Sequence, residues 1–212
     1  MPTEQRIAAA PIVAILRGVR PEQVVNVADV LYAAGMRVIE VPLNSPDPFA
    51  SIAALATVGR SDWVIGAGTV LSVADVGRTR DAGGQVIIAP NCNPEVIRAA
   101  LNAGLQVMPG IATASEAFSA LQAGAKFLKL FPAATYGPRH LQALSAVLPA
   151  GTGVFPVGGI GAADIPAWVA AGAVGFGFGS ELFKPSYSLT DIAQRATALM
   201  AEFRKAGHKP KQ

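Results

Sequence analysis

Residues 123–132 read AGAKFLKLFP: an alanine–glycine pair, an apolar run from Phe127 to Phe131 interrupted only by Lys129, and a proline that ends the run. A glycine after a helix-like segment is typical of a left-handed helix stop, and a short apolar run is typical of a buried strand. The stretch therefore predicts a helix that ends at Gly124 and a strand that follows it directly.

The same unit recurs along the chain. Glycines follow helix-like segments and precede apolar runs at positions 35, 59, 83, 104, 124, 151 and 172, and six of the seven come after alanine. One more run precedes the first of these glycines, so the expected strands are Ile12–Leu16, Val38–Val41, Val64–Ile65, Val86–Ile88, Gln106–Met108, Phe127–Phe131, Val154–Val157 and Val174–Phe178. Such even alternation predicts an α/β protein, a closed (β/α)8 TIM barrel in a single domain over residues 1–212. The alternative is an open doubly wound sheet.

Signals for the beginning of helices agree with this arrangement. They consist of a proline at the first helical position or a capping-box spacing, and they fall at Pro21, Ser45-Pro46, Ser72 to Asp75, Asn93-Pro94 and Thr113 to Glu116. A short N-terminal helix over Glu4–Ala9 is expected to plug the base of the barrel. The last helix is expected from Thr190 to about Lys205, followed by a frayed polar tail over about residues 206–212.

Composition excludes several classes of function. The chain is 51% hydrophobic and 15% charged, which argues against disorder and favours strands covered on both faces. The formal charge of +3 arises in residues 202–212, because residues 1–201 carry as many acidic as basic groups. The sequence pI near 9.2 is therefore a property of the tail, and nucleic acid is not an expected partner.

Two further features bear on location and redox chemistry. Leu141–Ala163 has no charge, but prolines and glycines punctuate it, so a membrane span is not expected. A single cysteine, Cys92, excludes an intramolecular disulfide and fits a reducing cytoplasm. Cys92 lies in a turn between prolines and is a poor candidate for a catalytic thiol. Residues 1–16 resemble an export signal only faintly, since no convincing cleavage site follows.

Lys129 is the first candidate for chemistry. Burial disfavours a charged amine, so a lysine among large apolar residues can lose its proton near neutral pH and attack a carbonyl group. The alternative is an ordinary lysine that extends its charge into water from the strand end. Lys126 lies three residues earlier, on the other face of the strand, and is expected to be solvated.

The carboxyl ends of barrel strands carry the active site in this fold, so the residues at those ends are candidates. Glu40, between Ile39 and Val41, could move protons beside Lys129; alternatively it forms a structural salt bridge with Arg17 or Lys129. Arg17 offers a planar guanidinium for a substrate carboxylate, or else it is a surface arginine.

Two glycine-containing pairs follow the last two expected strands: Gly158-Gly159 and Gly179-Ser180. Barrels often bind phosphate at this position through bare backbone N–H groups, although glycine also serves tight turns. The only histidines are His140 and His208. The chain therefore lacks the imidazole cluster of a metal-dependent aldolase or epimerase, and neither a metal nor another cofactor is expected.

Five stretches in order resemble the KDPG/KHG aldolase family: Ala14–Gly18, Val38–Ser45, Gly66–Leu71, Phe127–Pro132 and Pro156–Ile160. The similarity runs from about residue 10 to 200. It implies that Lys129 forms the imine of a class I aldolase and that Glu40 is the proton shuttle. It also implies that Arg17 and Thr69 bind substrate near the pyruvyl end, that Gly158, Gly159, Gly179 and Ser180 bind the phosphate, and that the protein is a trimer.

Positions 44 and 157 distinguish the branches of this family. The gluconate-derived branch usually has arginine where Asn44 stands and threonine where Val157 stands, whereas this chain resembles the galactonate-derived branch. The resemblance therefore implies cleavage of 2-dehydro-3-deoxy-6-phospho-D-galactonate to pyruvate and D-glyceraldehyde 3-phosphate. Three alternatives remain: the C4-epimeric gluconate as main or equal substrate, a metal-dependent phosphosugar epimerase or isomerase, and a silent sugar-phosphate binding protein.

Overall fold

Strands and helices alternate along the chain, and every strand pairing is parallel. The structure is a computed structural model that describes residues 1–207. Its strands are β1 (Ile12–Ile15), β2 (Val38–Pro42), β3 (Val64–Gly68), β4 (Val86–Ile88), β5 (Gln106–Met108), β6 (Gly110–Ile111), β7 (Phe127–Leu130), β8 (Gly153–Pro156) and β9 (Phe176–Phe178). Its helices are α1 (Thr3–Ala9), α2 (Pro21–Ala34), α3 (Pro48–Val58), α4 (Val73–Asp81), α5 (Pro94–Asn102), α6 (Ala114–Gln122), α7 (Ala133–Tyr136), α8 (Pro138–Ser145), η1 (Ala162–Asp164), α9 (Ile165–Ala170) and α10 (Leu189–Lys205).

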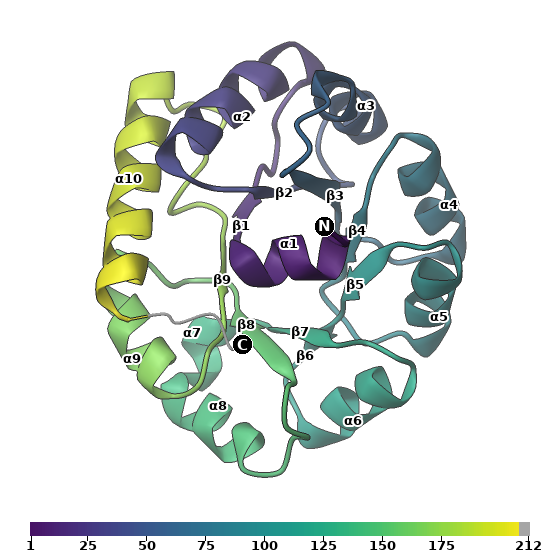
Figure 1. Ribbon diagram of the computed structural model, residues 1–212, viewed down its shortest axis with the longest axis vertical. Helices are drawn as coiled ribbons and strands as arrows, with labels where there is room; N and C mark the ends of the chain where they lie inside the picture. Colours follow the sequence, from purple (N-terminus) through teal and green to yellow (C-terminus); the bar gives the residue numbers. More distant parts are fainter. Residues whose placement is uncertain (208–212) are drawn as a thin grey trace.

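The strands form two parallel sheets, which confirms the predicted α/β class. One sheet has the order β5-β4-β3-β2-β1-β9 and the other has the order β6-β7-β8. Only Pro109 separates β5 from β6, which explains why nine strands appear in residues 1–207 where eight runs were expected. An isolated parallel bridge between Val157 and Gly177 lies where β8 approaches β9. The strands surround the centre of the molecule and helices cover the outside (Figure 1).

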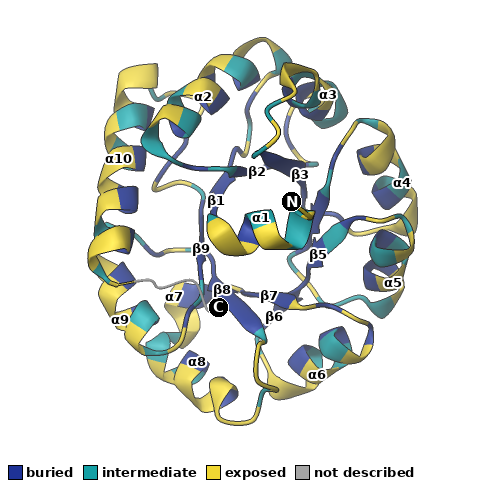
Figure 2. Cartoon of the chain, viewed as in Figure 1, coloured by how far each residue is buried: buried dark blue, intermediate teal, exposed yellow. Residues whose placement is uncertain are grey.

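Apolar side chains fill two layers, one inside the ring of strands and one between the strands and the helices. The inner layer contains Val13, Val38, Val64, Met108, Phe127 and Phe155, all at alternating strand positions. Ile7 of α1 is fully buried in this inner layer. The helix lies across the centre of the strands and turns its exposed side outward (Figures 1 and 2). The expectation of a short N-terminal helix at the base is therefore confirmed.

The ends of the helices follow the predicted glycine signals. All seven recurring glycines have positive φ angles, from +70° at Gly59 to +104° at Gly35. Helices α2 and α5 begin at Pro21 and Pro94, and the side chains of Ser72, Asn93 and Thr113 cap α4, α5 and α6.

The prediction of a helix start at Ser45-Pro46 is wrong. Helix α3 begins two residues later, at Pro48, with Asp47 as the preceding residue. The hydroxyl of Ser45 instead accepts a hydrogen bond from the backbone N–H of Gly18, at 2.9 Å. A contact with another loop therefore uses the side chain that the local pattern assigned to a cap.

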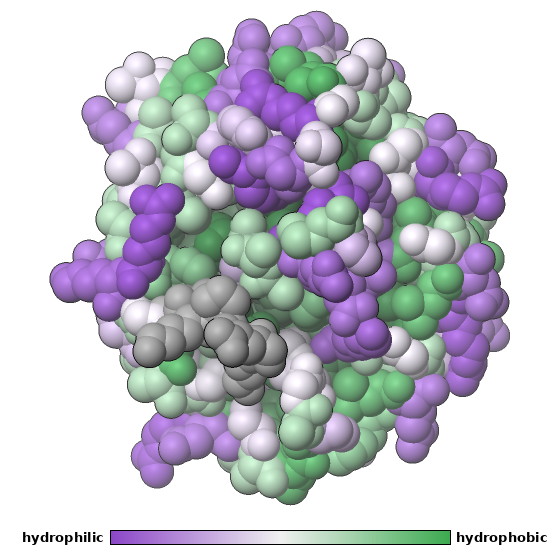
Figure 3. Space-filling view, viewed as in Figure 1, coloured by the Kyte–Doolittle hydropathy of each residue, from purple (hydrophilic) through white to green (hydrophobic). Residues whose placement is uncertain are grey.

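The last helix, α10, covers Leu189–Lys205, as expected within one residue. The expected polar tail covers about residues 206–212, and 208–212 of it lie outside the described residues. Figure 3 shows hydrophobic and hydrophilic residues mixed over the face that carries α1. Within residues 1–207, no helix combines the length and the apolar character that crossing a membrane requires.

Candidate active site

A cavity of about 150 Å³ opens at the carboxyl ends of the strands. Eight of the ten predicted site residues line it: Arg17, Thr69, Lys129, Val157, Gly158, Gly159, Gly179 and Ser180. The other two are not part of the lining. Asn44 hydrogen-bonds to Arg17 at the rim, and Glu40 is buried in the wall of the strands. The sequence positions therefore converge on one place in the fold.

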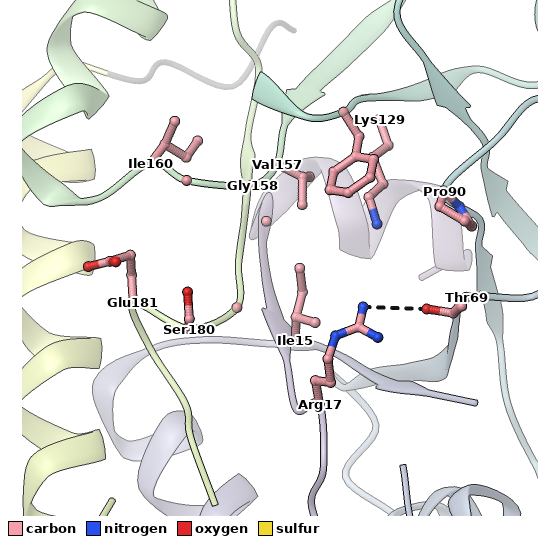
Figure 4. Close-up of a pocket in the computed structure, with 14 residues that line it drawn as sticks. Ile15, Arg17, Thr69, Pro90, Lys129, Val157, Gly158, Ile160, Ser180 and Glu181 are labelled. Carbon is pink, nitrogen blue, oxygen red and sulfur yellow. Dashed lines mark hydrogen bonds between the residues drawn. The ribbon is translucent and has the colours of Figure 1, made fainter. Parts of the chain in front are cut away.

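Lys129 is supplied by β7, between Gly110 of β6 and Phe155 of β8. Its residue exposure is only 5%, and its amine points into the cavity (Figure 4). The Nζ atom lies 5.2 Å from the centre of the Phe131 ring. Among residues 1–207, no ion pair engages this amine, so it can meet a ligand in the cavity.

Lys126 has the opposite surroundings. Its Nζ lies 2.8 Å from Oε2 of Glu4 in an exposed ion pair, and its side chain is 65% exposed. The prediction that Lys126 is solvated is confirmed. Of the two lysines near β7, only Lys129 is available to the cavity.

Glu40 is supplied by β2 and is 1% exposed. Burial raises the pKa of its carboxyl group above the ordinary value of 4.5, while the positive charges of Lys129 and Arg17 oppose that effect. Within residues 1–207, its Oε2 atom has no hydrogen-bond partner. A buried carboxyl group with an unused oxygen and a raised pKa can hold and release a proton, as an acid–base catalyst must.

Arg17 follows β1 and is held at the rim by two neighbours. One guanidinium nitrogen donates to Oδ1 of Asn44, and the other donates to Oγ1 of Thr69 at 3.5 Å. Thr69 has a φ of +58°, unusual for a β-branched residue, directly after β3. The two contacts point the guanidinium into the cavity from the side opposite Lys129 (Figure 4).

The end of the cavity formed after β8 and β9 consists largely of backbone. Gly158 and Gly159 have φ angles of +97° and +72°, a conformation that favours glycine. Within the described chain, the backbone N–H groups of Gly159 and Ser180 make no hydrogen bond to protein, and Gly158 directly follows the bridge between Val157 and Gly177. Together with the Ser180 hydroxyl, these donors suit a small oxyanion.

Sequence reasoning missed several lining residues. Glu181 follows the Gly179-Ser180 pair, and Ile15, Ile160 and Gly177 also line the cavity. Gly177 leaves the space that Val157 fills, because a Cβ atom at position 177 would lie 2.7 Å from a methyl group of Val157. The alternation of side chains along β1 and β9 could have indicated Ile15 and Gly177, since both precede predicted site residues by two positions.

The arrangement defines a class of protein. A buried amine, a buried carboxyl group, a guanidinium at the rim and a row of backbone donors suit an enzyme that reacts with a carbonyl compound carrying anionic groups. Within residues 1–207, no group of three or more histidine, cysteine, aspartate or glutamate side chains is placed to hold a metal ion.

Comparison with known proteins narrows this class. Residues 3–198 match the family described as KDPG and KHG aldolase. The "Probable 2-dehydro-3-deoxy-6-phosphogalactonate aldolase" of Rhizobium meliloti (strain 1021) is 44% identical over 91% of this chain and 91% of its own. The "2-dehydro-3-deoxy-6-phosphogalactonate aldolase" of Escherichia coli (strain K12) is 42% identical over 92% of this chain and 96% of its own.

Solved structures agree. The structure titled "Native KDPGal structure" has a TM-score of 0.91 at 42% identity, over 92% of this chain and 95% of its own. A KDPG aldolase from Legionella pneumophila, with pyruvate captured as a covalent carbinolamine intermediate, has a TM-score of 0.80 at 26% identity, over 95% of this chain and 96% of its own. The chain belongs to the KDPG and KHG aldolase family, and it is an aldolase, a carbon–carbon lyase.

Proposed function

We propose that this protein is a class I aldolase that cleaves 2-dehydro-3-deoxy-6-phospho-D-galactonate to pyruvate and D-glyceraldehyde 3-phosphate. The single observation that carries the chemistry is the amine of Lys129, 5% exposed and directed into the cavity. The choice of substrate is supported by the two relatives at 44% and 42% identity, both of which bear the name of the galactonate-derived substrate.

In the proposed reaction, unprotonated Lys129 attacks C2 of the substrate and forms a carbinolamine. Loss of water gives the protonated imine. When the C3–C4 bond breaks, its electron pair moves into this imine and produces an enamine, while the C4 hydroxyl becomes the aldehyde of glyceraldehyde 3-phosphate. Protonation of the enamine at C3 gives the pyruvyl imine, and water then releases pyruvate and restores the amine. The carbinolamine captured with pyruvate in the Legionella pneumophila KDPG aldolase is an intermediate of this type.

Glu40 is proposed to move the protons of this sequence. It supplies a proton to the departing water, removes the C4 hydroxyl proton directly or through one water, and returns a proton to C3. Because burial raises the pKa of Glu40, its carboxyl group holds a proton at higher pH than an ordinary glutamate does, which suits it to donate a proton as well as to accept one.

The remaining site residues are proposed to bind the two ends of the substrate. Arg17 and Thr69 bind near the pyruvyl carboxylate, where a guanidinium can pair with both oxygens. Gly158, Gly159, Gly179 and Ser180 bind the phosphate, with the unpaired backbone N–H groups of Gly159 and Ser180 as donors.

Asn44 and Val157 are proposed to set specificity. Asn44 holds Arg17 in place, and Val157 lines the cavity with an apolar surface where threonine would offer a hydroxyl group. Without a threonine hydroxyl at position 157, the site cannot hydrogen-bond to the C4 hydroxyl there. It therefore lacks the contact that would favour the C4 epimer whose hydroxyl points toward this position.

Three broader features belong to the same proposal. The two sheets are taken as parts of one closed (β/α)8 barrel in a single domain, supported by the bridge from Val157 to Gly177 and by the continuation of β5 into β6.

The protein is proposed to be a homo-oligomer, a trimer by family resemblance, with exposed apolar residues such as Leu71 and Val73 available for contacts. It is placed in the cytoplasm, where a lone free cysteine stays reduced.

Three measurements test the function. Borohydride added with pyruvate should reduce the imine and increase the mass of the peptide that carries Lys129; an unmodified protein would contradict the mechanism. A lactate dehydrogenase coupled assay on both C4 epimers should show faster pyruvate release from the galactonate. Equal rates of pyruvate release from the two epimers would contradict the proposed specificity but not the proposed mechanism. Activity abolished by EDTA would favour the metal-dependent alternative.

A further inference from the structure

Two glycines at the end of β3 face Glu40. In the parallel pairing of β2 with β3, Glu40 lies opposite Gly66 and Pro42 lies opposite Gly68. Side chains two positions apart share a face of a strand, and Val38 and Val64 belong to the inner apolar layer, so Glu40, Gly66 and Gly68 all lie on the inner face. Glu40 is therefore the one large side chain among these three neighbouring inward positions.

The carboxylate of Glu40 lies directly against the backbone of Gly68. A Cβ atom at position 68 would be 2.6 Å from Cδ, 2.7 Å from Oε1 and 2.8 Å from Oε2 of Glu40, and these are the three nearest atoms. Each of these distances is too short for a real contact. The φ angle of Gly68 is not in the left-handed region, so backbone conformation gives no reason for a glycine here.

Gly66 has a different reason to be glycine. A Cβ atom there would lie 1.9 Å from the carbonyl oxygen of Val86, which is backbone of the neighbouring strand β4. A side chain at position 66 would thus disturb the sheet itself. A side chain at position 68 would meet first the movable end of Glu40.

We infer that Gly68 is a positioning residue, whose missing side chain makes the seat in which the Glu40 carboxylate is held for proton transfer. The inference rests on the proposed function, since it assumes that Glu40 moves protons. A methyl group in the seat forces the carboxylate away from the strand and toward the cavity. Displacement of a catalytic group by about 1 Å can cost about 10²-fold in rate.

The test is Gly68→Ala, with Gly77→Ala in α4 as the matched control. No atom lies within 4 Å of a Cβ at position 77, and that glycine lies outside the site. We expect Gly68→Ala to lower kcat by about 10²-fold with a smaller change in KM, and to keep borohydride trapping of pyruvate on Lys129. Gly77→Ala should keep the kcat of the wild type.

Two readouts separate positioning from general damage. In a crystal structure of the Gly68→Ala variant, the Glu40 carboxylate should have moved out of its seat. Burial is the main cause of its raised pKa, so a carboxylate moved toward water should shift the Glu40-dependent limb of the kcat–pH profile to lower pH. An unmoved carboxylate with an unchanged profile overturns the inference.

A double-mutant cycle guards against a variant that folds poorly. In a Glu40→Ala background, Gly68→Ala should cost no thermal stability, because the obstructing carboxylate is gone. An equal loss of stability in both backgrounds overturns the inference, since it would mean that the new methyl group meets something other than Glu40.

Glu40→Gln distinguishes the positioning role of Gly68 from the proposed role of Glu40 itself. If Glu40→Gln is inactive and Gly68→Ala has wild-type kcat, only the role of Gly68 is wrong. If Glu40→Gln keeps full activity, the proposed role of Glu40 itself is wrong, and the positioning role falls with it.

Discussion

The two ends of the strand ring each hold a lysine and a glutamate, in opposite conditions. At the base, Lys126 and Glu4 meet in water at 2.8 Å, with side chains 65% and 38% exposed. At the mouth, Lys129 and Glu40 are 5% and 1% exposed, and within residues 1–207 they form no direct ion pair. The same two residue types therefore serve as a surface pair at one end and as separate, partly desolvated groups at the other. Burial, rather than residue type, makes the second set suited to chemistry.

The largest expected effect comes from exchanging the two lysines for methionine one at a time. Lys129→Met should reduce kcat/KM by at least about 10³-fold and abolish trapping of pyruvate by borohydride, because no amine remains in the cavity. Lys126→Met should keep both properties. A coupled assay measures kcat/KM, and mass spectrometry detects the trapped adduct. An adduct on Lys126 would contradict the assignment of Lys129 as the reactive amine.

The two glutamates should differ next most strongly. Glu40→Gln should lower kcat by about 10²- to 10⁴-fold, because the amide cannot exchange protons, while pyruvate can still be trapped on Lys129. Glu4→Gln should leave kcat unchanged. Steady-state kinetics and borohydride labelling of both variants measure this difference. Equal loss of kcat in the two variants would show that the mouth holds no special carboxyl group.

The pH dependence of stability sharpens the contrast further. The pKa of Glu40 is raised in the folded state, so above the ordinary value of 4.5 the folded protein binds more protons than the unfolded chain, and stability falls as pH rises toward the raised value. The slope is at most about 1.4 kcal/mol per pH unit. Glu40→Gln should remove this slope, whereas Glu4→Gln should retain it. Urea unfolding of the three proteins across that pH range is the measurement, and parallel curves would contradict the assignment.

The smallest effect belongs to the pair at the base. Removing the Lys126 to Glu4 ion pair by a double-mutant cycle should change the free energy of unfolding by less than about 1 kcal/mol, because both side chains are exposed. The coupling should vanish in 1 M salt, where the Debye length is about 3 Å. A coupling of several kcal/mol that survives salt would mean that the base also holds a desolvated pair.

The repeating part of the fold could be predicted because its signals are local. A glycine such as Gly35 or Gly124 ends a helix through its own φ angle, and the apolar run behind it is buried on both faces. The capping residues Ser72 and Thr113 likewise act on backbone groups three residues away. The interruption at Pro109 was not predicted, because proline removes one donor without marking where the next pairing resumes.

The sequence predicted where two candidate catalytic residues, Lys129 and Glu40, would lie, but it did not predict the contacts that support the site. Lys129 and Glu40 are conspicuous because charged residues are rare inside buried runs. The contact of Asn44 with Arg17 joins residues 27 positions apart, and Ser45 reaches Gly18 over the same separation. The seat at Gly68 depends on the register of β2 with β3, which no local pattern encodes.

Ile7 of α1 fills the inner apolar layer at the base of the strands, and the cavity that holds Lys129 opens at their carboxyl ends. In the proposed reaction, the three-carbon fragment stays covalently bound to Lys129 until the last step, whereas the phosphorylated fragment is set free when the C3–C4 bond breaks. Departure is then compulsory in order: the aldehyde goes out first and the keto acid follows. The pattern of product inhibition should therefore show that the aldehyde is released before pyruvate.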